Sequence, residues 1–271
     1  MDAPITFLHL TDLHISDPAT PDPHLACDTL AVLDRVIDTI AGLTRRPDFV
    51  LISGDLTNRG DAASYRLLAD RLQAIAAPVL LALGNHDARG PFRAEMLGAP
   101  GEAAYVHDRL IGGAHVIVLD SLVPGRIGGA LDAAQFDFLG AALNRHPDVP
   151  KLVMLHHPPA LEPDAEMVWH SLNWEDSDRL GAMLEGRVAG LFCGHVHVPR
   201  VSHWRGLPVV TGNGLYNTAD PLIDEGMRVV EATGFGLCRL RPSGLSVDFV
   251  SLPHSGRELD RMPQAALLSW R

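Results

Sequence analysis

Five short blocks of the sequence concentrate aspartate, asparagine and histidine, the side chains that hold transition metals through oxygen and nitrogen. In chain order, the blocks are Asp12-x-His14, Gly54-Asp55, Gly84-Asn85-His86-Asp87, His156-His157 and Gly194-His195-x-His197. Carboxylate oxygen, amide oxygen and neutral imidazole suit Mn, Fe, Zn or Co. The three cysteines have no CxxC spacing, so thiolates are not part of the pattern. The blocks predict a transition-metal site built from oxygen and nitrogen donors.

Asp55 is the residue that could join two ions, because a carboxylate has two oxygens and can bridge. Two ions roughly 3.5–4 Å apart can clamp a phosphate and ionise a shared water. Glycine precedes Asp55, Asn85 and His195, where the backbone would have to turn sharply and approach the ions closely. The remaining ligands, divided around Asp55, could therefore complete two metal sites.

Each block directly follows an apolar run that is typical of a buried strand. The expected strands are 5–10, 49–53, 79–83, 116–119, 152–155 and 188–192, with helical stripes at 30–40, 65–75, 132–143 and 180–184 between them. This alternation predicts an α/β protein, in which ligand sites lie beyond the carboxyl ends of the strands. The last expected strands, 207–210, 235–240 and 245–252, favour antiparallel pairing. We expect one domain over residues 1–253 and a tail over 254–271 that is an arm or disordered.

The composition excludes several classes of partner. The chain has 271 residues, with 22 Lys+Arg and 33 Asp+Glu, which gives a net charge of 22 − 33 = −11. That balance argues against a nucleic-acid polymer and against a polybasic membrane contact. No apolar run approaches the roughly 18 residues of a membrane span, and the first ten residues do not form a signal peptide pattern. We therefore expect a cytoplasmic protein without a membrane partner.

Taken in order, the five blocks resemble the motifs of the calcineurin-like metallophosphoesterases. Within that family, two segments are most similar to the bacterial class III cyclic-nucleotide phosphodiesterase and glycerophosphodiesterase branch. They are His156-His157-Pro158-Pro159 and Phe192-Cys193-Gly194-His195. The resemblance implies a four-layer αββα sandwich of two mixed β-sheets flanked by helices. It also implies a homo-oligomer, since relatives in this branch often assemble through their C-terminal regions.

The same resemblance implies a role for each block residue. Asp12, His14 and His197 would hold one ion, Asn85, His156 and His195 the other, and Asp55 both. His86 would contact the phosphate or assist the leaving group, and Asp87 would orient His86. The implied reaction is hydrolysis of a small phosphodiester, either a 3′,5′-cyclic nucleotide or a glycerophosphodiester, by a hydroxide that bridges two divalent or mixed-valence ions.

Two other functions stay open. A phosphomonoesterase, such as a nucleotidase or a protein phosphatase, would need extra cationic groups, which Arg89, Arg93, Arg109 and Arg126 could supply. A non-catalytic scaffold of the same fold would have lost metal ligands or the histidine beside the asparagine, and this chain keeps them.

Several residues near the blocks have more than one interpretation. His157 could support a ligand, contact the substrate or be a mere neighbour. Trp169, His170 and Trp174 fall in an expected long loop, where they could line a substrate pocket or pack in a subunit interface. Asn213 and Tyr216 follow a later strand and could rim the site. Asn58 and Arg59 are expected to finish the turn after Asp55.

Overall fold

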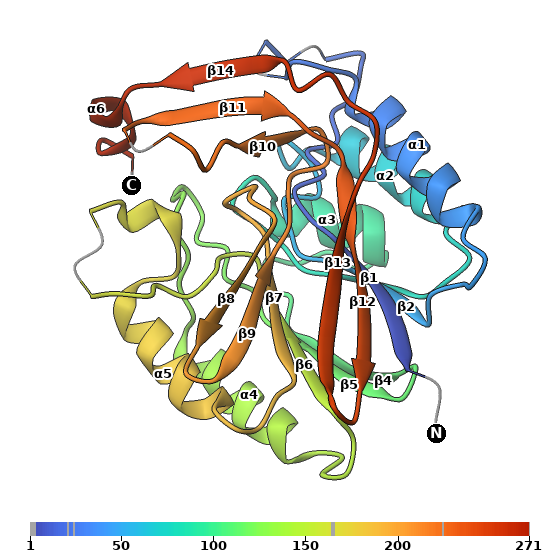
Figure 1. Cartoon of the computed structure of the whole chain (residues 1–271), viewed down its shortest axis with the longest axis vertical. Coiled ribbons are helices and arrows are strands. Elements are labelled where there is room, and N and C mark those ends of the chain that lie inside the picture. The colour runs from blue at the N-terminus through green and yellow to red at the C-terminus, as the bar shows by residue number, and fades with distance from the viewer. Residues whose placement is uncertain (1–3, 21, 24, 164–165, 224, 271) are drawn as a thin grey trace.

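Two mixed β-sheets face each other at the centre of the computed structural model, which describes residues 4–20, 22–23, 25–163, 166–223 and 225–270 (Figure 1). The first sheet has the order β13 (Gly244–Ser251), β12 (Gly234–Arg241), β1 (Ile5–Leu10), β2 (Phe49–Ile52) and β3 (Val79–Leu81). The second has the order β4 (His107–Ile111), β5 (Ala114–Val118), β6 (Lys151–Met154), β7 (Gly190–Cys193), β9 (Leu207–Thr211) and β8 (Arg200–Trp204). Strands β1, β2 and β3 run parallel, as do β5, β6, β7 and β9.

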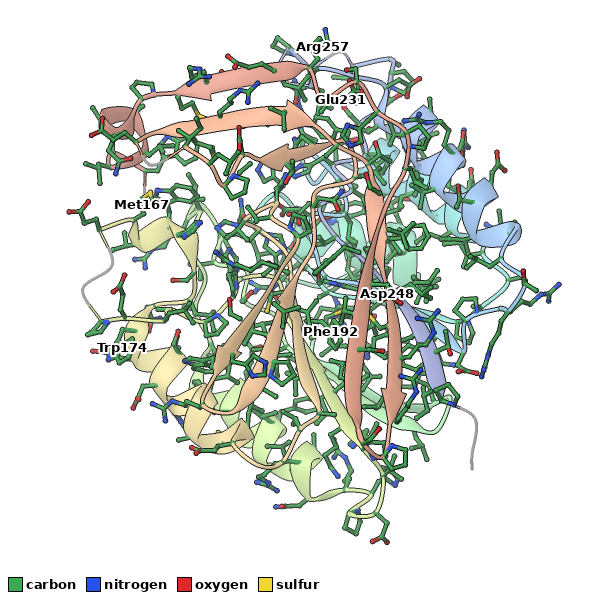
Figure 2. The ribbon with its side chains drawn as sticks, viewed as in Figure 1. Met167, Trp174, Phe192, Glu231, Asp248 and Arg257 are labelled. Atoms are coloured by element: carbon green, nitrogen blue, oxygen red, sulfur yellow. The ribbon has the colours of Figure 1, made fainter. Side chains whose placement is uncertain are left out.

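Aromatic side chains fill the space between the two sheets. Because successive residues of a strand point to opposite faces, Phe7 of β1 and Phe49 of β2 point inward. Their rings stack with centroids 4.8 Å apart. Phe192 of the second sheet, labelled in Figure 2, meets Phe7 edge-on with centroids 5.3 Å apart. These rings are part of the buried cluster that packs the two sheets together.

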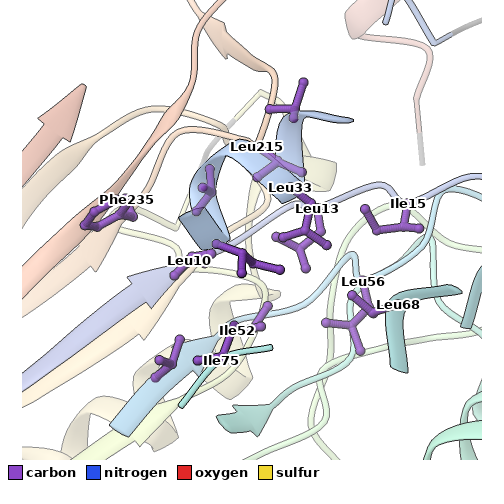
Figure 3. Close-up of a cluster of buried hydrophobic side chains, with 14 of the residues drawn as sticks. Leu10, Leu13, Ile15, Leu33, Ile52, Leu56, Leu68, Ile75, Leu215 and Phe235 are labelled. Carbon is purple, nitrogen blue, oxygen red and sulfur yellow. The ribbon is translucent and has the colours of Figure 1, made fainter. Parts of the chain in front are cut away.

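Helices cover the outer face of each sheet, which completes the predicted four-layer sandwich. Leu33 of helix α1 (Thr29–Ala41) and Leu68 of helix α2 (Ala62–Leu72) belong to one buried cluster with Leu10 and Ile52 of the first sheet (Figure 3). Phe92 of α3 (Arg89–Leu97) is part of the same cluster. Helices α4 (Ala133–Asn144) and α5 (Trp174–Leu184) cover the second sheet. The predicted fold class is confirmed, with strand bounds that differ by only a few residues.

The segment between His157 and α5 is more regular than the sequence suggested. Trp169 and His170 lie in a 3-10 turn, η1 (Val168–His170), and Trp174 opens α5 instead of lying in a loop. The side chain of Asn173 accepts a hydrogen bond from the backbone N–H of Asp176 at 2.8 Å and caps this helix. The helix therefore begins six residues before the predicted stripe.

A third, small sheet lies across one end of the sandwich and includes part of the expected tail. Its order is β10 (Asn217–Ala219), β11 (Met227–Glu231) and β14 (Glu258–Met262), followed by α6 (Gln264–Leu267) (Figure 1). Within the tail 254–271, expected to be an arm or disordered, residues 258–262 pair with β11 and residues 264–267 form a short helix. Among the described residues, no helix has both the length and the apolar character that crossing a membrane requires.

Candidate metal centre

The loops that carry the five blocks meet where the strands of both sheets end. Backbone hydrogen bonds join them: the N–H of Asp12 donates to Gly54 O at 3.0 Å, and that of His14 to Asp55 O at 2.9 Å. The N–H of Gly194 donates to His156 O at 2.8 Å. All seven residues predicted as ligands lie together here, and their roles as ligands stay a prediction.

One set of donor atoms comes from Asp12, His14, His197 and Asp55. His197 Nε2 lies 3.1 Å from Asp12 Oδ1 and 3.3 Å from His14 Nε2. His14 Nε2 lies 3.7 Å from Asp55 Oδ2. Ligands about 2.0–2.2 Å from a common ion lie roughly 3.0–3.7 Å apart, so this set has the spacing of a coordination shell.

A second set comes from Asn85, His156, His195 and again Asp55. Asn85 Oδ1 lies 3.0 Å from His195 Nδ1 and 3.2 Å from His156 Nε2. His156 Nε2 lies 3.3 Å from the same Asp55 oxygen that approaches His14. Asp55 therefore stands between the two sets, as the bridging hypothesis requires.

Each of the four imidazoles uses its other nitrogen to bind an oxygen outside the two sets. The pairs are His14 Nδ1 with Asn58 Oδ1 at 3.0 Å, His156 Nδ1 with Ser53 O at 2.8 Å, His195 Nε2 with Trp169 O at 2.7 Å, and His197 Nδ1 with Asn217 Oδ1. Because these oxygens only accept, the outer nitrogens must donate, and in the neutral rings the inner nitrogens present lone pairs to one another. Only a proton or a cation between them relieves that arrangement, so the donor set fits metal ions.

The backbone at the centre is held in a conformation that L-residues rarely adopt. Of the seven described non-glycine residues with positive φ, five are expected ligands, with φ from 46° to 71°: Asp12, His14, Asp55, His195 and His197. Such residues cost of order 1–3 kcal/mol each and persist where the surroundings impose them. Gly84 shows how close the loops come, because a Cβ there would lie 2.2 Å from Asp55 Oδ1.

Burial and neighbouring charges set the protonation of the centre. Burial lowers the pKa of His14 and of His195 to about 3, which leaves both neutral, the form that binds metal. Burial also disfavours charge on His156, but the carboxylates of Asp55 and Asp12 outweigh it and raise the pKa of His156 to about 9. A metal ion competes with that proton, because it binds the neutral ring.

Asp87 does not orient His86, which corrects the expectation from the sequence. Its carboxylate accepts hydrogen bonds from the backbone N–H groups of Leu56, Thr57 and Gly84 at 3.0, 3.1 and 2.9 Å and from the Tyr65 hydroxyl at 2.9 Å. Burial and the nearby charge of Asp55 raise the pKa of Asp87 to about 6. Asp87 therefore ties together the loops that carry Asp55 and Asn85.

His86 is oriented by a main-chain oxygen. Its Nδ1 donates to Asn58 O at 2.9 Å, and its backbone N–H donates to Asp55 Oδ1 at 2.8 Å. The side chain is exposed and lines the cavity beside the centre. Asn58 thus does more than finish a turn, since its side chain holds His14 and its carbonyl holds His86.

Asp87→Ala should lower the free energy of unfolding of the metal-free protein by about 3 kcal/mol or more, because each buried donor left without a partner costs about 1–3 kcal/mol. Urea unfolding in the presence of EDTA measures the change. Asp132→Ala is the matched control, because it removes the single N-cap bond of α4 and should cost only about 1 kcal/mol. Equal losses in the two variants would contradict the tying role of Asp87.

His157 is a buried neighbour of the centre. One of its nitrogens lies within 4.8 Å of donor atoms of His156 and His195, but both nitrogens have partners elsewhere. His157 Nε2 donates to Ile127 O at 2.8 Å, and Nδ1 accepts from Ser121 Oγ at 2.7 Å. Its ring packs 4.5 Å from that of His195, so His157 supports this side of the centre without facing the cavity.

A cavity of about 680 Å³ opens beside the two donor sets. Its described lining includes Trp169, His170 and Tyr216, which the sequence left open, but neither Trp174 nor Asn213. Asn213 lines a separate cavity of about 220 Å³. The roles of Asn58, Asn217 and the Trp169 carbonyl in holding the imidazoles were missed, because no local motif marks an acceptor that approaches from another segment.

Comparisons with known proteins agree with this geometry. Residues 5–199 match the family described as calcineurin-like phosphoesterase. A Rhodococcus erythropolis protein named probable cyclic nucleotide phosphodiesterase is 31% identical over 229 residues, which cover 81% of this chain and 73% of that protein. An Enterobacter lignolyticus protein named glycerophosphodiester phosphodiesterase GpdQ is 30% identical and covers 65% of each chain. The crystal structure of a dimetal phosphatase from Danio rerio has a TM-score of 0.64 at 15% identity, over 94% of this chain and 100% of that chain, and shares the fold.

Proposed function

This chain belongs to the calcineurin-like phosphoesterase family, and from that premise we propose that it is a metal-dependent hydrolase of small phosphodiesters, either 3′,5′-cyclic nucleotides or glycerophosphodiesters. The relatives named for these two activities support the two substrate classes. The observation that carries the proposal is the pair of donor sets that share the Asp55 carboxylate.

Asp12, His14 and His197 are assigned to one ion, Asn85, His156 and His195 to the other, and Asp55 to both. Mn, Fe, Zn or Co suit this mixture of imidazole, carboxylate and amide oxygen. Two such ions supply Lewis-acid charge to a phosphoryl group and make water a better nucleophile near neutral pH.

His86 is assigned to the reacting phosphate, since it is an exposed imidazole within 4.8 Å of donor atoms of His14 and of the shared Asp55. Its Nδ1 donates to the Asn58 carbonyl, so in the protonated ring Nε2–H is the group left to point into the cavity. That N–H can hold charge on a phosphoryl oxygen or pass its proton to the departing alkoxide.

The charges around the cavity favour a diester over a monoester. Among the described residues of the lining, Arg200 is the one arginine, against three aspartates, and there is no lysine. None of the four arginines that could have served a monoesterase lines the cavity, and Arg89 is committed to Asp120 at 2.8 Å. A monoester dianion would find little added positive charge here, whereas a diester carries one negative charge.

With Mn²⁺ added, kcat/KM for bis(p-nitrophenyl) phosphate should exceed that for p-nitrophenyl phosphate by at least about tenfold, a difference of about 1.4 kcal/mol in the barrier. The same panel should include 3′,5′- and 2′,3′-cyclic AMP and glycerophosphoethanolamine, to separate the two natural classes. EDTA treatment should abolish turnover and Mn²⁺ should restore it. A much faster monoester would overturn the diester proposal, and a chain that binds none of these metals would favour the scaffold hypothesis.

We also propose that the chain acts on small molecules rather than on a nucleic-acid polymer, because its net charge is −11. We also propose the homo-oligomer that the family resemblance implies, and light scattering of the purified protein measures it directly.

A further inference from the structure

His195 differs from His14 and His156 in what holds its outer nitrogen. The acceptors for His14 and His156 belong to the segment that carries Asp55, on residues Asn58 and Ser53. The acceptor for His195 is the main-chain oxygen of Trp169, in η1, a turn that no strand of either sheet includes. The orientation of His195 therefore depends on what keeps this turn in place.

The C-terminal residues keep Trp169 in place. Its indole Nε1 donates to Leu267 O at 2.9 Å, and its ring packs against that of Trp270 with centroids 4.9 Å apart. Both tryptophans and Leu267 line the cavity, while Trp169 itself is only 6% exposed. A buried indole N–H needs an acceptor, so loss of the Leu267 contact would displace the turn.

The C-terminal residues are in turn fixed to the small sheet. Gln264 Oε1 accepts from the backbone N–H of Gly226 at 3.0 Å, and β14 pairs with β11 directly before α6. Leu267 is only 1% exposed, so the helix packs on the body of the protein. Figure 2 shows Met167, next to η1, on the same side of the molecule as α6.

We propose that Trp169 is a positioning residue for His195, and that Leu267 and Trp270 at the end of the chain thereby set the metal affinity of the Asn85–His156–His195 set. The proposal rests on the metal-dependent function proposed above. A partner that orients a metal-binding histidine typically changes affinity by 10–100-fold when it is lost. Because the contact acts on His195 alone, the affinity of the set that contains His14 and His197 should not change.

The test is calorimetric titration of the metal-free full-length protein with Mn²⁺ alone, without substrate. Wild type should bind two ions per chain. Trp169→Phe, which removes the indole donor and keeps a ring, and Trp270→Ala, which removes the ring contact, should each weaken one of the two affinities by about tenfold or more. Trp174→Phe is the matched control, since Trp174 lies at the start of α5 outside the cavity lining. Both Mn²⁺ affinities of this variant should stay at the wild-type values.

Turnover at increasing Mn²⁺ provides a second readout that a general loss of structure would not give. The two variants should need about tenfold more Mn²⁺ for half-maximal rate and should approach the wild-type kcat at saturation. Unchanged Mn²⁺ affinities in the two variants, or an equal loss of Mn²⁺ affinity at both donor sets, would overturn the positioning role of Trp169. If Trp169→Phe does not fold, Trp270→Ala alone decides. Fewer than two ions on wild type would instead overturn the proposed function, and the inference with it.

Discussion

Asp55→Asn should lower kcat/KM for a phosphodiester by at least about 10³-fold and should reduce the Mn²⁺ bound per chain from two ions to one or none. Asp55 Oδ2 is the atom that approaches both donor sets, at 3.7 Å from His14 Nε2 and 3.3 Å from His156 Nε2. Metal ions contribute several kcal/mol to such reactions, and each 1.36 kcal/mol is a factor of ten in rate. Metal analysis together with steady-state kinetics measures both losses.

The asparagine variant separates metal binding from loop structure. An amide oxygen at this position can still accept the backbone N–H of His86, which donates to Asp55 Oδ1 at 2.8 Å. The fold should therefore survive, and circular dichroism should match wild type. Asp12→Asn should affect mainly one ion, because Asp12 belongs to the set with His14 and His197. Asp70→Asn, on the exposed face of α2, controls for the lost charge. Two tightly bound ions and normal turnover in Asp55→Asn would refute the shared-aspartate arrangement.

The convergence of the donor side chains could be predicted because it follows from strand order. Strands β1, β2 and β3 are parallel neighbours in one sheet, and β6 and β7 are parallel neighbours in the other. Residues that directly follow parallel strands must meet at one edge, whatever their distance in sequence. The apolar runs before Asp12, Asp55 and His156 carried that information, and the resemblance to a known family added the pairing of the two sheets.

The partners of those side chains could not be predicted, because they depend on contacts between segments that share no pattern. Asp87 sits beside His86 in the sequence, yet its carboxylate binds backbone N–H groups, including those of Leu56 and Thr57 on the loop after β2. Asn217 reaches His197 from the small sheet. Every residue except proline has a backbone N–H, so the residue types in the sequence do not show which N–H groups a carboxylate will bind. The imidazole of His86, adjacent in the sequence, was therefore the expected partner of Asp87.

The strand and helix of the C-terminal segment could not be predicted, for a related reason. Strand β14 is short and mostly exposed, and it lacks the alternation that marks a half-buried strand. It is ordered by pairing with β11, where the register shifts between Val229 and Val230, and its neighbour α6 contacts Trp169 through the carbonyl of Leu267. Both contacts are long-range, so their strength cannot be judged from the segment alone.

His86→Ala should lower kcat by about 10²–10⁴-fold while the protein still binds two ions, because general acid catalysis contributes about that much. The main-chain N–H that donates to Asp55 survives the substitution, and the imidazole itself is exposed, so the donor sets keep their positions. The loss should be largest for an alkyl leaving group, such as that of a cyclic nucleotide or glycerophosphoethanolamine. It should be smaller for p-nitrophenolate, which departs without a proton.

The dependence on the leaving group is what distinguishes proton transfer from charge stabilisation at His86. If His86 only holds charge on a phosphoryl oxygen, alkyl and p-nitrophenyl diesters should lose the same factor, since that charge develops in both reactions. If its role is structural, metal content and turnover should fall together. His203→Ala, at an exposed position on β8 away from the cavity lining, controls for removal of an imidazole and should keep wild-type kcat. A normal kcat for alkyl diesters in His86→Ala would exclude a role for His86 in the reaction. Hydrolysis would then depend only on the residues of the two donor sets around Asp55.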